Sequence, residues 1–290
     1  MKQKSIGYLE IIVAVSIWAL SSGILVRWIS QGAIVLYGVG AMAGAFFVLL
    51  YLFLTKRISE IQKSYIWRKE LFWIGLFIGL NNGLFFLALK TTTIANAIIT
   101  HYFAPIVLVL IFAPLILRQK IRKQHIFATV LGFIGLIVVF GSQIGNEIFD
   151  VGIILGLASA VFFAWHTAIE SKLATNTKID PLVEVLYKNG VPALMFLPFV
   201  IGEIAENTVT MIDFSKLIFY GILVLGISFI LVYRGLAKVS SQSASVLFYG
   251  EPIGAIILAW IVWNESLNVS VVLGGSLVLL AGYLVTKNKG

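Results

Sequence analysis

The chain has 290 residues, of which 60% are hydrophobic and 12% are charged. Soluble domains average roughly 45–50% apolar and about 25% charged residues, so this composition excludes a soluble globular protein. The formal net charge is +8, and cysteine is absent, which excludes disulfide bonds and cysteine metal sites.

Ten apolar stretches follow one another along the chain, each close to the roughly 20 residues that a helix needs to cross a bilayer. They are too long for the roughly ten-residue alternating strands of an outer-membrane barrel. The first stretch lacks a small-residue cleavage site, so we interpret it as a helix of the mature protein. The predicted helices are Ile6–Val26, Ala33–Leu54, Leu71–Leu89, Ile94–Leu117, Ile126–Phe140, Val151–Ile169, Leu182–Ile201, Leu217–Tyr233, Ser243–Trp263 and Val269–Thr286. The expected fold class is therefore all-α, a polytopic membrane protein with about ten transmembrane helices.

Basic residues in the connections predict the direction of these helices, because cytoplasmic loops carry an excess of lysine and arginine. If the N-terminus is cytoplasmic, only Arg27, Lys90 and Lys216 fall on the outer side, and Lys188 falls within the seventh helix. The remaining seventeen of the 21 lysines and arginines fall on the inner side. Both termini are thus predicted to be cytoplasmic, and the positive charge indicates topology rather than nucleic-acid binding.

The two halves of the chain resemble each other. Residues 97–105 read AIITHYFAP and residues 244–252 read ASVLFYGEP, so that in both segments alanine stands eight positions before proline and tyrosine three. Two halves of five helices each must run in opposite directions through the membrane. Inverted repeats of this kind are a transporter architecture, in which the substrate binds between the halves near the midplane.

With these features the chain resembles the drug/metabolite transporter superfamily, specifically its EamA-type members. The resemblance rests on the ten-helix layout, the two prolines, the Glu251-Pro252 pair and Glu265 after the ninth helix. Residues 1–145 and 146–290 are accordingly expected to be two EamA-like repeats of five helices each. One departure is Arg118-Gln-Lys120, where family members often carry an acidic residue. The resemblance implies a central cavity, alternating access and a cargo of small metabolites or amino acids, usually exported.

Ionisable side chains within the membrane are costly and are therefore functional candidates. Glu251 falls near the middle of the ninth helix, directly before Pro252, whose ring removes one backbone hydrogen bond. Its carboxyl group could pair with a cationic substrate or hold a proton that is released when water reaches it. His101 in the fourth helix could couple protons, bind cargo or only bond to a neighbouring helix.

Two further pairs of ionisable residues lie one helical turn apart. His166 lies near the cytoplasmic end of the sixth helix with Glu170 one turn later, and Glu184 precedes Lys188 in the seventh. Such i,i+4 pairs can simply stabilise a helix, and the flexible lysine stem is expected to extend towards the inner surface. Glu10, a turn into the first helix, is expected to do the same.

Polar and aromatic residues complete the predicted site. The amides of Asn81 and Asn82 need partners in lipid, and we expect them to point towards the cavity because three glycines spaced by four residues give the third helix a separate packing face. Several deep aromatic residues could form cavity walls, with Tyr102 and Tyr249 related by the repeat. The predicted substrate-binding or coupling residues are Glu251, His101, Tyr102, Tyr249, Asn81, Asn82, Trp165, His166 and Trp18.

These features favour a secondary transporter of small metabolites, most simply amino acids or related amines, with export expected and proton coupling left open. An intramembrane enzyme is disfavoured because the three histidines are far apart in sequence and no H-E-x-x-H is present. A channel or a structural membrane component is the other alternative, although the loops are short and the polar residues scattered. No cofactor or metal is expected. The expected partners are a small-molecule substrate and membrane lipid, without nucleic acid, and a homodimer is left open.

Overall fold

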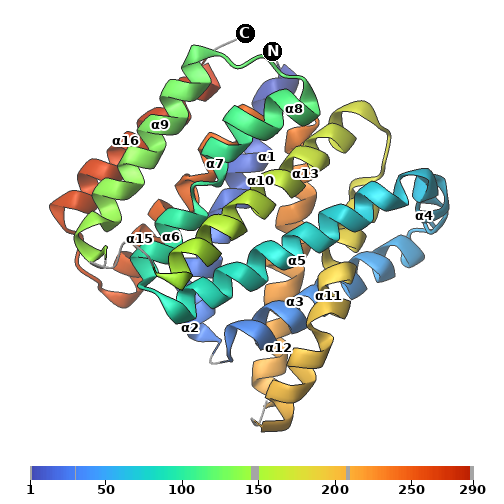
Figure 1. The fold of residues 1–290 in the computed structure, drawn as a ribbon. Coiled ribbons are helices and arrows are strands. Elements are labelled where there is room, and N and C mark those ends of the chain that lie inside the picture. The colour runs from blue at the N-terminus through green and yellow to red at the C-terminus, as the bar shows by residue number, and fades with distance from the viewer. Residues whose placement is uncertain (1, 30, 145–149, 207–209, 288–290) are drawn as a thin grey trace.

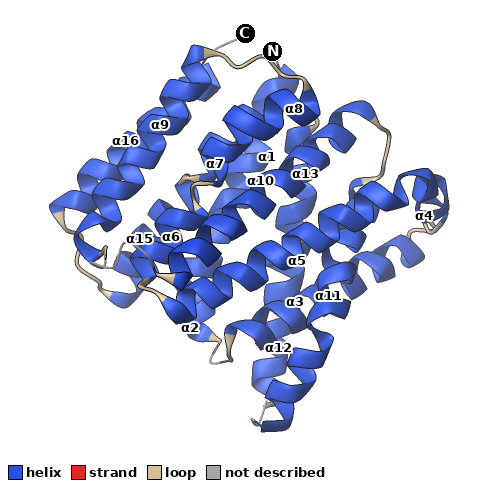
Figure 2. Cartoon of the chain, viewed as in Figure 1, coloured by secondary structure: helices blue, strands red, loops and turns tan. Residues whose placement is uncertain are grey.

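The computed structural model describes residues 2–29, 31–144, 150–206 and 210–287. This part of the chain is helical throughout, with short loops and no strand (Figure 2). It contains ten helical spans that are long and apolar enough to cross a membrane. The prediction of a polytopic all-α fold is confirmed.

Several spans consist of more than one helical element. The first is α1 (Lys2–Leu20), η1 (Ser21–Leu25) and α2 (Val26–Trp28); the second is α3 (Ala33–Leu54); the third is α4 (Ser59–Lys63), η2 (Ser64–Trp67) and α5 (Arg68–Thr91). The fourth is α6 (Ile94–His101), α7 (Ala104–Val107), η3 (Leu108–Phe112) and α8 (Ala113–Leu117); the fifth is α9 (Lys123–Phe140) with η4 (Gly141–Gln143). The sixth is α10 (Val151–Asn176) and the seventh is α11 (Pro181–Glu206). The eighth is α12 (Met211–Tyr220), η5 (Gly221–Ile227) and α13 (Ser228–Leu236); the ninth is α14 (Ser241–Phe248) and α15 (Gly250–Trp263); the tenth is α16 (Val269–Lys287).

The fourth and ninth spans are broken at corresponding points of the two similar segments. The fourth is interrupted at Tyr102 and Phe103, between α6 and α7, and the ninth at Tyr249, between α14 and α15. In each span a proline follows the break, and its ring cannot donate the backbone hydrogen bond that would continue the helix. Broken helices of this kind are tolerated at membrane depth where they are buried in protein or line a cavity.

Three spans contain a stretch of wider, π-helical winding: η1 in the first, η3 in the fourth and η5 in the eighth. Such stretches are uncommon and occur frequently at functional sites, since they turn the following side chains to a new direction. Two of the three, η1 and η5, lie next to the cavity described below.

The spans pack in pairs that join distant parts of the chain (Figure 1). α5 packs along α10, α3 along α11 and α1 along α13, whereas α9 and α16 form a separate pair at one edge of the bundle. The two ends of the chain lie at the same end of the molecule. We refer to this end as the terminal end.

Small residues permit the closest of these approaches. On α5, a Cβ atom at Gly75 would lie 2.5 Å from the carbonyl oxygen of Tyr187 in α11. At the α9–α16 contact, a Cβ atom at Gly274 would lie 2.4 Å from the carbonyl oxygen of Gly135. Because both neighbours are backbone atoms, they cannot rotate away from an added methyl group.

Replacing Gly274 by alanine is therefore expected to separate α9 from α16 and lower the free energy of unfolding by about 1–3 kcal/mol, as overpacking does. The matched control is Gly282→Ala on the same helix, where the new Cβ would be 3.4 Å from Cδ2 of Leu247, an ordinary contact. Thermal unfolding of the purified protein in detergent compares the two variants. Equal midpoints for both would contradict the close packing of α9 on α16.

Candidate functional site

A cavity of about 560 Å³ lies in the centre of the bundle. Its wall is made by side chains of the first nine spans, with only Phe140 from the fifth, and none of its described wall residues belongs to α16. Ligand cavities of drug-sized molecules measure roughly 300–1,000 Å³, so this space is large enough for a small organic molecule. The near absence of wall residues from these two spans is consistent with the position of α9 and α16 at the edge of the bundle.

The cavity extends to one end of the bundle, the end opposite the chain termini. Its wall there includes Arg27, Ile94 and Glu265, which lie where the first, fourth and ninth spans begin or end at that side. Arg27 and Glu265 form an ion pair, and the indole of Trp263 donates a hydrogen bond of 2.9 Å to the carbonyl of Gly23. These contacts tie the first span to the ninth at the mouth of the cavity.

The terminal end is closed by polar contacts between spans. Glu10 of α1 pairs with Arg234 and Lys238, which lie in and just after α13, at 2.9 Å from Nε of Arg234. Ser241 donates to Gln119 at 3.2 Å, so α14 is attached to the loop after α8. The sequence predicted that Glu10 extends to the membrane surface. That prediction was wrong, because Glu10 is buried among these contacts between spans.

Glu251 lies in the cavity wall on the first turn of α15, directly after the helix break. One of its carboxylate oxygens accepts a hydrogen bond of 2.9 Å from the hydroxyl of Ser22 in η1. The phenol of Tyr102, at the break in the fourth span, lies near the same carboxyl group and interacts with it electrostatically. The two helix breaks and the first π-helical turn therefore converge on one carboxyl group.

Aromatic rings form much of the remaining wall. The rings of His101 and His166 both stack on Phe163, with ring centroids 5.3 and 5.4 Å from that of the phenylalanine. Nδ1 of His101 lies 2.8 Å from the hydroxyl of Ser159 in α10. In the described part of the chain, no group of three His, Asp or Glu side chains is placed to hold a metal ion.

The two asparagines of α5 also lie in the wall. Asn82 donates to the carbonyl of Ile78 at 2.9 Å, which satisfies one donor of its amide. Oδ1 of Asn81 is buried and has no hydrogen-bond partner among the described residues. Since buried polar atoms are normally paired, Asn81 offers an acceptor to a molecule in the cavity.

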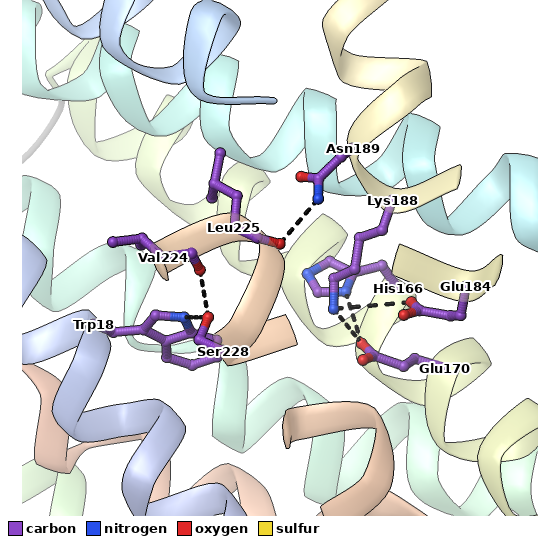
Figure 3. A network of polar contacts seen from close by, with 9 residues as sticks. All are labelled: Trp18, His166, Glu170, Glu184, Lys188, Asn189, Val224, Leu225 and Ser228. Atoms are coloured by element: carbon purple, nitrogen blue, oxygen red, sulfur yellow. Dashed lines mark hydrogen bonds and ion pairs between the residues drawn. The ribbon is translucent and has the colours of Figure 1, made fainter. Parts of the chain in front are cut away.

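Trp18 connects the wall to the π-helical stretch of the eighth span (Figure 3). Its indole donates a hydrogen bond of 2.7 Å to the hydroxyl of Ser228, which in turn donates to the carbonyl of Val224. From the other side, the amide of Asn189 donates to the carbonyl of Leu225 at 2.9 Å. Side chains of the first and seventh spans thus hydrogen-bond to η5 and to the residue that follows it.

A group of buried charges connects α10 and α11 through its side chains (Figure 3). Nζ of Lys188 is 2.7 Å from Oε2 of Glu170 and 4.0 Å from Oε1 of Glu184. Nδ1 of His166 is 3.7 Å from the same oxygen of Glu170. His166, Glu170 and Lys188 belong to the cavity wall, whereas Glu184 lies one helical turn before Lys188, towards the terminal end.

Seven of the nine predicted site residues line the cavity, and two do not. The seven are Trp18, Asn81, Asn82, His101, Tyr102, His166 and Glu251. Trp165 projects away from the cavity and packs on Phe77, with ring centroids 4.5 Å apart. Tyr249 is fully buried against α9, where its ring covers Gly132. Both belong to spans that contribute to the wall, but neither side chain is part of it.

Sequence reasoning missed Glu170, Lys188 and Ser22 as wall residues. For Lys188 it favoured a path to the inner surface and a local pair with Glu184, whereas the side chain is 1% exposed and its shorter contact is to another helix. The sequence did contain a signal for this contact. Lys188 has one glutamate, Glu184, on its own predicted helix and another, Glu170, at the end of the preceding one. This pattern alone does not show which glutamate the lysine contacts.

A multi-pass membrane protein with a central cavity reaching one end of the bundle, lined at two broken helices, has the architecture of a membrane transporter. Comparison with known sequences agrees. The chain belongs to the EamA-like transporter family, whose sequence profile matches residues 5–141 and again residues 150–287. The resemblance stated from the sequence is therefore confirmed.

Individual relatives give the same class. The chain is 26% identical over 178 residues to an uncharacterized transporter of Clostridium kluyveri, a match that covers 60% of this chain and 57% of that protein. It is 22% identical to the uncharacterized transporter YoaV of Bacillus subtilis, over 86% of this chain and 85% of the relative. A crystal structure of another protein has the same fold, with a TM-score of 0.78 at 20% identity, covering 98% of this chain and 96% of the other.

Proposed function

We propose that this transporter is a secondary carrier of amino acids or related amines, which it exports across the cytoplasmic membrane by alternating access. The observation that carries the proposal is the carboxyl group of Glu251, which accepts a hydrogen bond from Ser22 in the wall of a cavity that several aromatic rings line. A carboxylate among aromatic rings suits an organic cation, because both the charge and the ring faces attract it.

The shape of the cavity supports a carrier over a channel. The described wall reaches the mouth at Arg27 and Glu265, while the terminal end is sealed by Glu10 and its partners. A carrier opens its site to one side at a time, and this arrangement corresponds to one of its two states. Movement of the two halves against each other, as inverted repeats, would produce the other state.

We also propose an orientation of the protein in the membrane. With the termini in the cytoplasm, as the excess of basic residues on that side favours, the cavity faces outward. A fluorescent protein that matures only in the cytoplasm, fused after Gly290, checks this orientation. Absence of fluorescence from a fusion present in the membrane at full length would reverse it.

The transport proposal is tested by counterflow in proteoliposomes with two probes, phenethylamine and L-phenylalanine. Both carry an aromatic ring and an ammonium group, and only the amino acid adds a carboxylate. Vesicles preloaded with unlabelled probe are expected to take up the labelled form faster than empty vesicles, because a carrier returns loaded. Equal uptake by loaded and empty vesicles for both probes, matching protein-free vesicles, would contradict the proposal.

A further inference from the structure

Four ionisable side chains meet in the buried group between α10 and α11: His166, Glu170, Glu184 and Lys188. None is more than 3% exposed. Two carboxylates and one ammonium leave the group with an excess negative charge when all three are ionised. Removing an uncompensated charge from water costs several kcal/mol even after relaxation of the protein, so the group needs one more proton.

The hydrogen bonds show where that proton belongs. Glu170 receives the ammonium of Lys188 at 2.7 Å. Both oxygens of Glu184 are buried without a hydrogen-bond donor among the described residues, and its nearest oxygen is 4.0 Å from the ammonium. An ionised carboxylate without donors is the most costly state in such surroundings, and a second negative charge nearby disfavours it further. Glu184 is therefore the protonated member of the pair.

Among the described residues, the helices around the group supply no other positive charge to it. α13 presents the phenol of Tyr233, and α6 presents His101, whose ring stacks on Phe163. α5 presents apolar side chains, Leu71 and Ile74, at this contact. Asp180, at the foot of α11, is itself paired with Arg57. His166 is the remaining basic group, and neither of its ring nitrogens has a hydrogen-bond partner among the described residues.

The group also has a direction. His166, Glu170 and Lys188 are in the cavity wall, and Glu184 lies behind Lys188 on the first turn of α11, towards the terminal end. Lys188 thus stands between a carboxyl group that contacts the cavity and one that is shielded from it. This ordering resembles a short relay rather than a single structural ion pair.

We propose that the group formed by His166, Glu170, Glu184 and Lys188 is the proton-binding site that couples transport to a proton gradient. This inference rests on the proposed transport function. In the relay step, Nζ of Lys188 gives a proton to Oε2 of Glu170 and accepts one from the carboxyl group of Glu184. One N–H bond and one O–H bond break, one of each forms, and the ammonium then pairs with the Glu184 carboxylate.

Coupling follows from charge, because three members of the group, His166, Glu170 and Lys188, line the same cavity as Glu251. Loss of the proton adds one negative charge to the wall and strengthens the attraction of the cavity for a cationic cargo. Uptake of the proton removes this charge and weakens the attraction. Because linkage between two ligands is reciprocal, binding of the cargo lowers the affinity of the group for the proton by the same factor. A proton on the group and an organic cation in the cavity therefore exclude each other. The carrier would then exchange protons for the organic cation across the membrane.

The decisive variant is Glu184→Gln, since glutamine imitates the protonated carboxyl group and keeps its size. Phenethylamine counterflow without a gradient is expected to persist, because the cargo site is intact. An imposed proton gradient is expected to stimulate transport by the unmodified protein by about 5- to 150-fold, the usual range for two coupled sites. The variant is expected to show no such stimulation. Glu60→Gln, at an exposed ion pair on α4, is the matched control and should respond to the gradient as the unmodified protein does.

A Glu184→Gln variant that still responds to the gradient like the unmodified protein overturns the inference. If the unmodified protein shows no counterflow, the proposed function fails instead, and the site is tested without cargo. Infrared spectra of the unmodified protein should contain the carbonyl stretch of a protonated carboxylic acid at neutral pH that the variant lacks. Identical spectra of the two proteins in this region would refute a proton on Glu184. If the variant does not fold, the unmodified protein is sufficient, because absence of the band from its spectrum would also refute that proton.

Discussion

Replacing Glu251 by glutamine is expected to raise the half-saturating concentration of phenethylamine by about 30-fold or more. Losing one partner of a desolvated charge pair costs about 2–5 kcal/mol, and each 1.4 kcal/mol is a factor of about ten in affinity. The hydroxyl of Ser22 can donate to the oxygen of the amide that replaces the carboxylate, so the shape of the site is expected to persist. Counterflow rates measured over a range of probe concentrations give the effect.

The control for this variant is again Glu60→Gln, which makes the same chemical change outside the cavity. Its half-saturating concentration should equal that of the unmodified protein. A Glu251→Gln carrier with unchanged half-saturation would show that the ammonium group of the cargo binds elsewhere. In that case Asn81 and the aromatic wall would be the next residues to replace.

Replacing Lys188 by methionine is expected to lower the free energy of unfolding by about 3–5 kcal/mol, because it leaves the carboxyl groups of Glu170 and Glu184 buried without their cation. Lys63→Met is an informative comparison. Lys63 is 2.6 Å from Glu60, as close as Lys188 is to Glu170, but this lysine side chain is 67% exposed. An exposed pair contributes about 0–1 kcal/mol, so the second variant should melt almost as the unmodified protein does.

The double variant Lys188→Met/Glu170→Gln separates charge from packing. Removing the carboxylate of Glu170 together with the lysine should recover part of the lost stability, since residues in one network are not additive. Thermal unfolding in detergent of Lys188→Met, Glu170→Gln and the double variant gives the interaction energy between the two residues. A double variant less stable than Lys188→Met alone would mean that Glu170 is held by groups other than the lysine.

Hydropathy and turn residues predicted the ten spans closely, because crossing a bilayer imposes a length and a composition that are local properties of the sequence. The tenth span was predicted as Val269–Thr286 and is Val269–Lys287. The third shows the limit of the method. It was predicted to start at Leu71, but its helical path already begins at Ser59, in a polar segment that hydropathy alone does not mark.

The direction in which each side chain points was harder to predict, since a broken or π-helical segment changes the face on which later residues lie. Tyr102 and Tyr249 match in the two similar segments, yet Tyr102 lies in the cavity wall and Tyr249 packs against α9. Likewise Trp165 and His166 are neighbours on α10, and only His166 faces the cavity. Equivalent positions in a repeat need not have equivalent surroundings when the partner helices differ.

The π-helical stretch η5 has a consequence for comparing this chain with its relatives. A turn of such winding holds one residue more than an α-helical turn, and one residue of an α-helix corresponds to a rotation of about 100°. Deleting a single residue between Gly221 and Ile227 would leave the hydropathy of the eighth span almost unchanged. It would nevertheless rotate Ser228 and Phe229 away from Trp18 and Lys188, their present neighbours. In an alignment of relatives, a one-residue gap at this point would therefore mark a carrier with a different cavity wall.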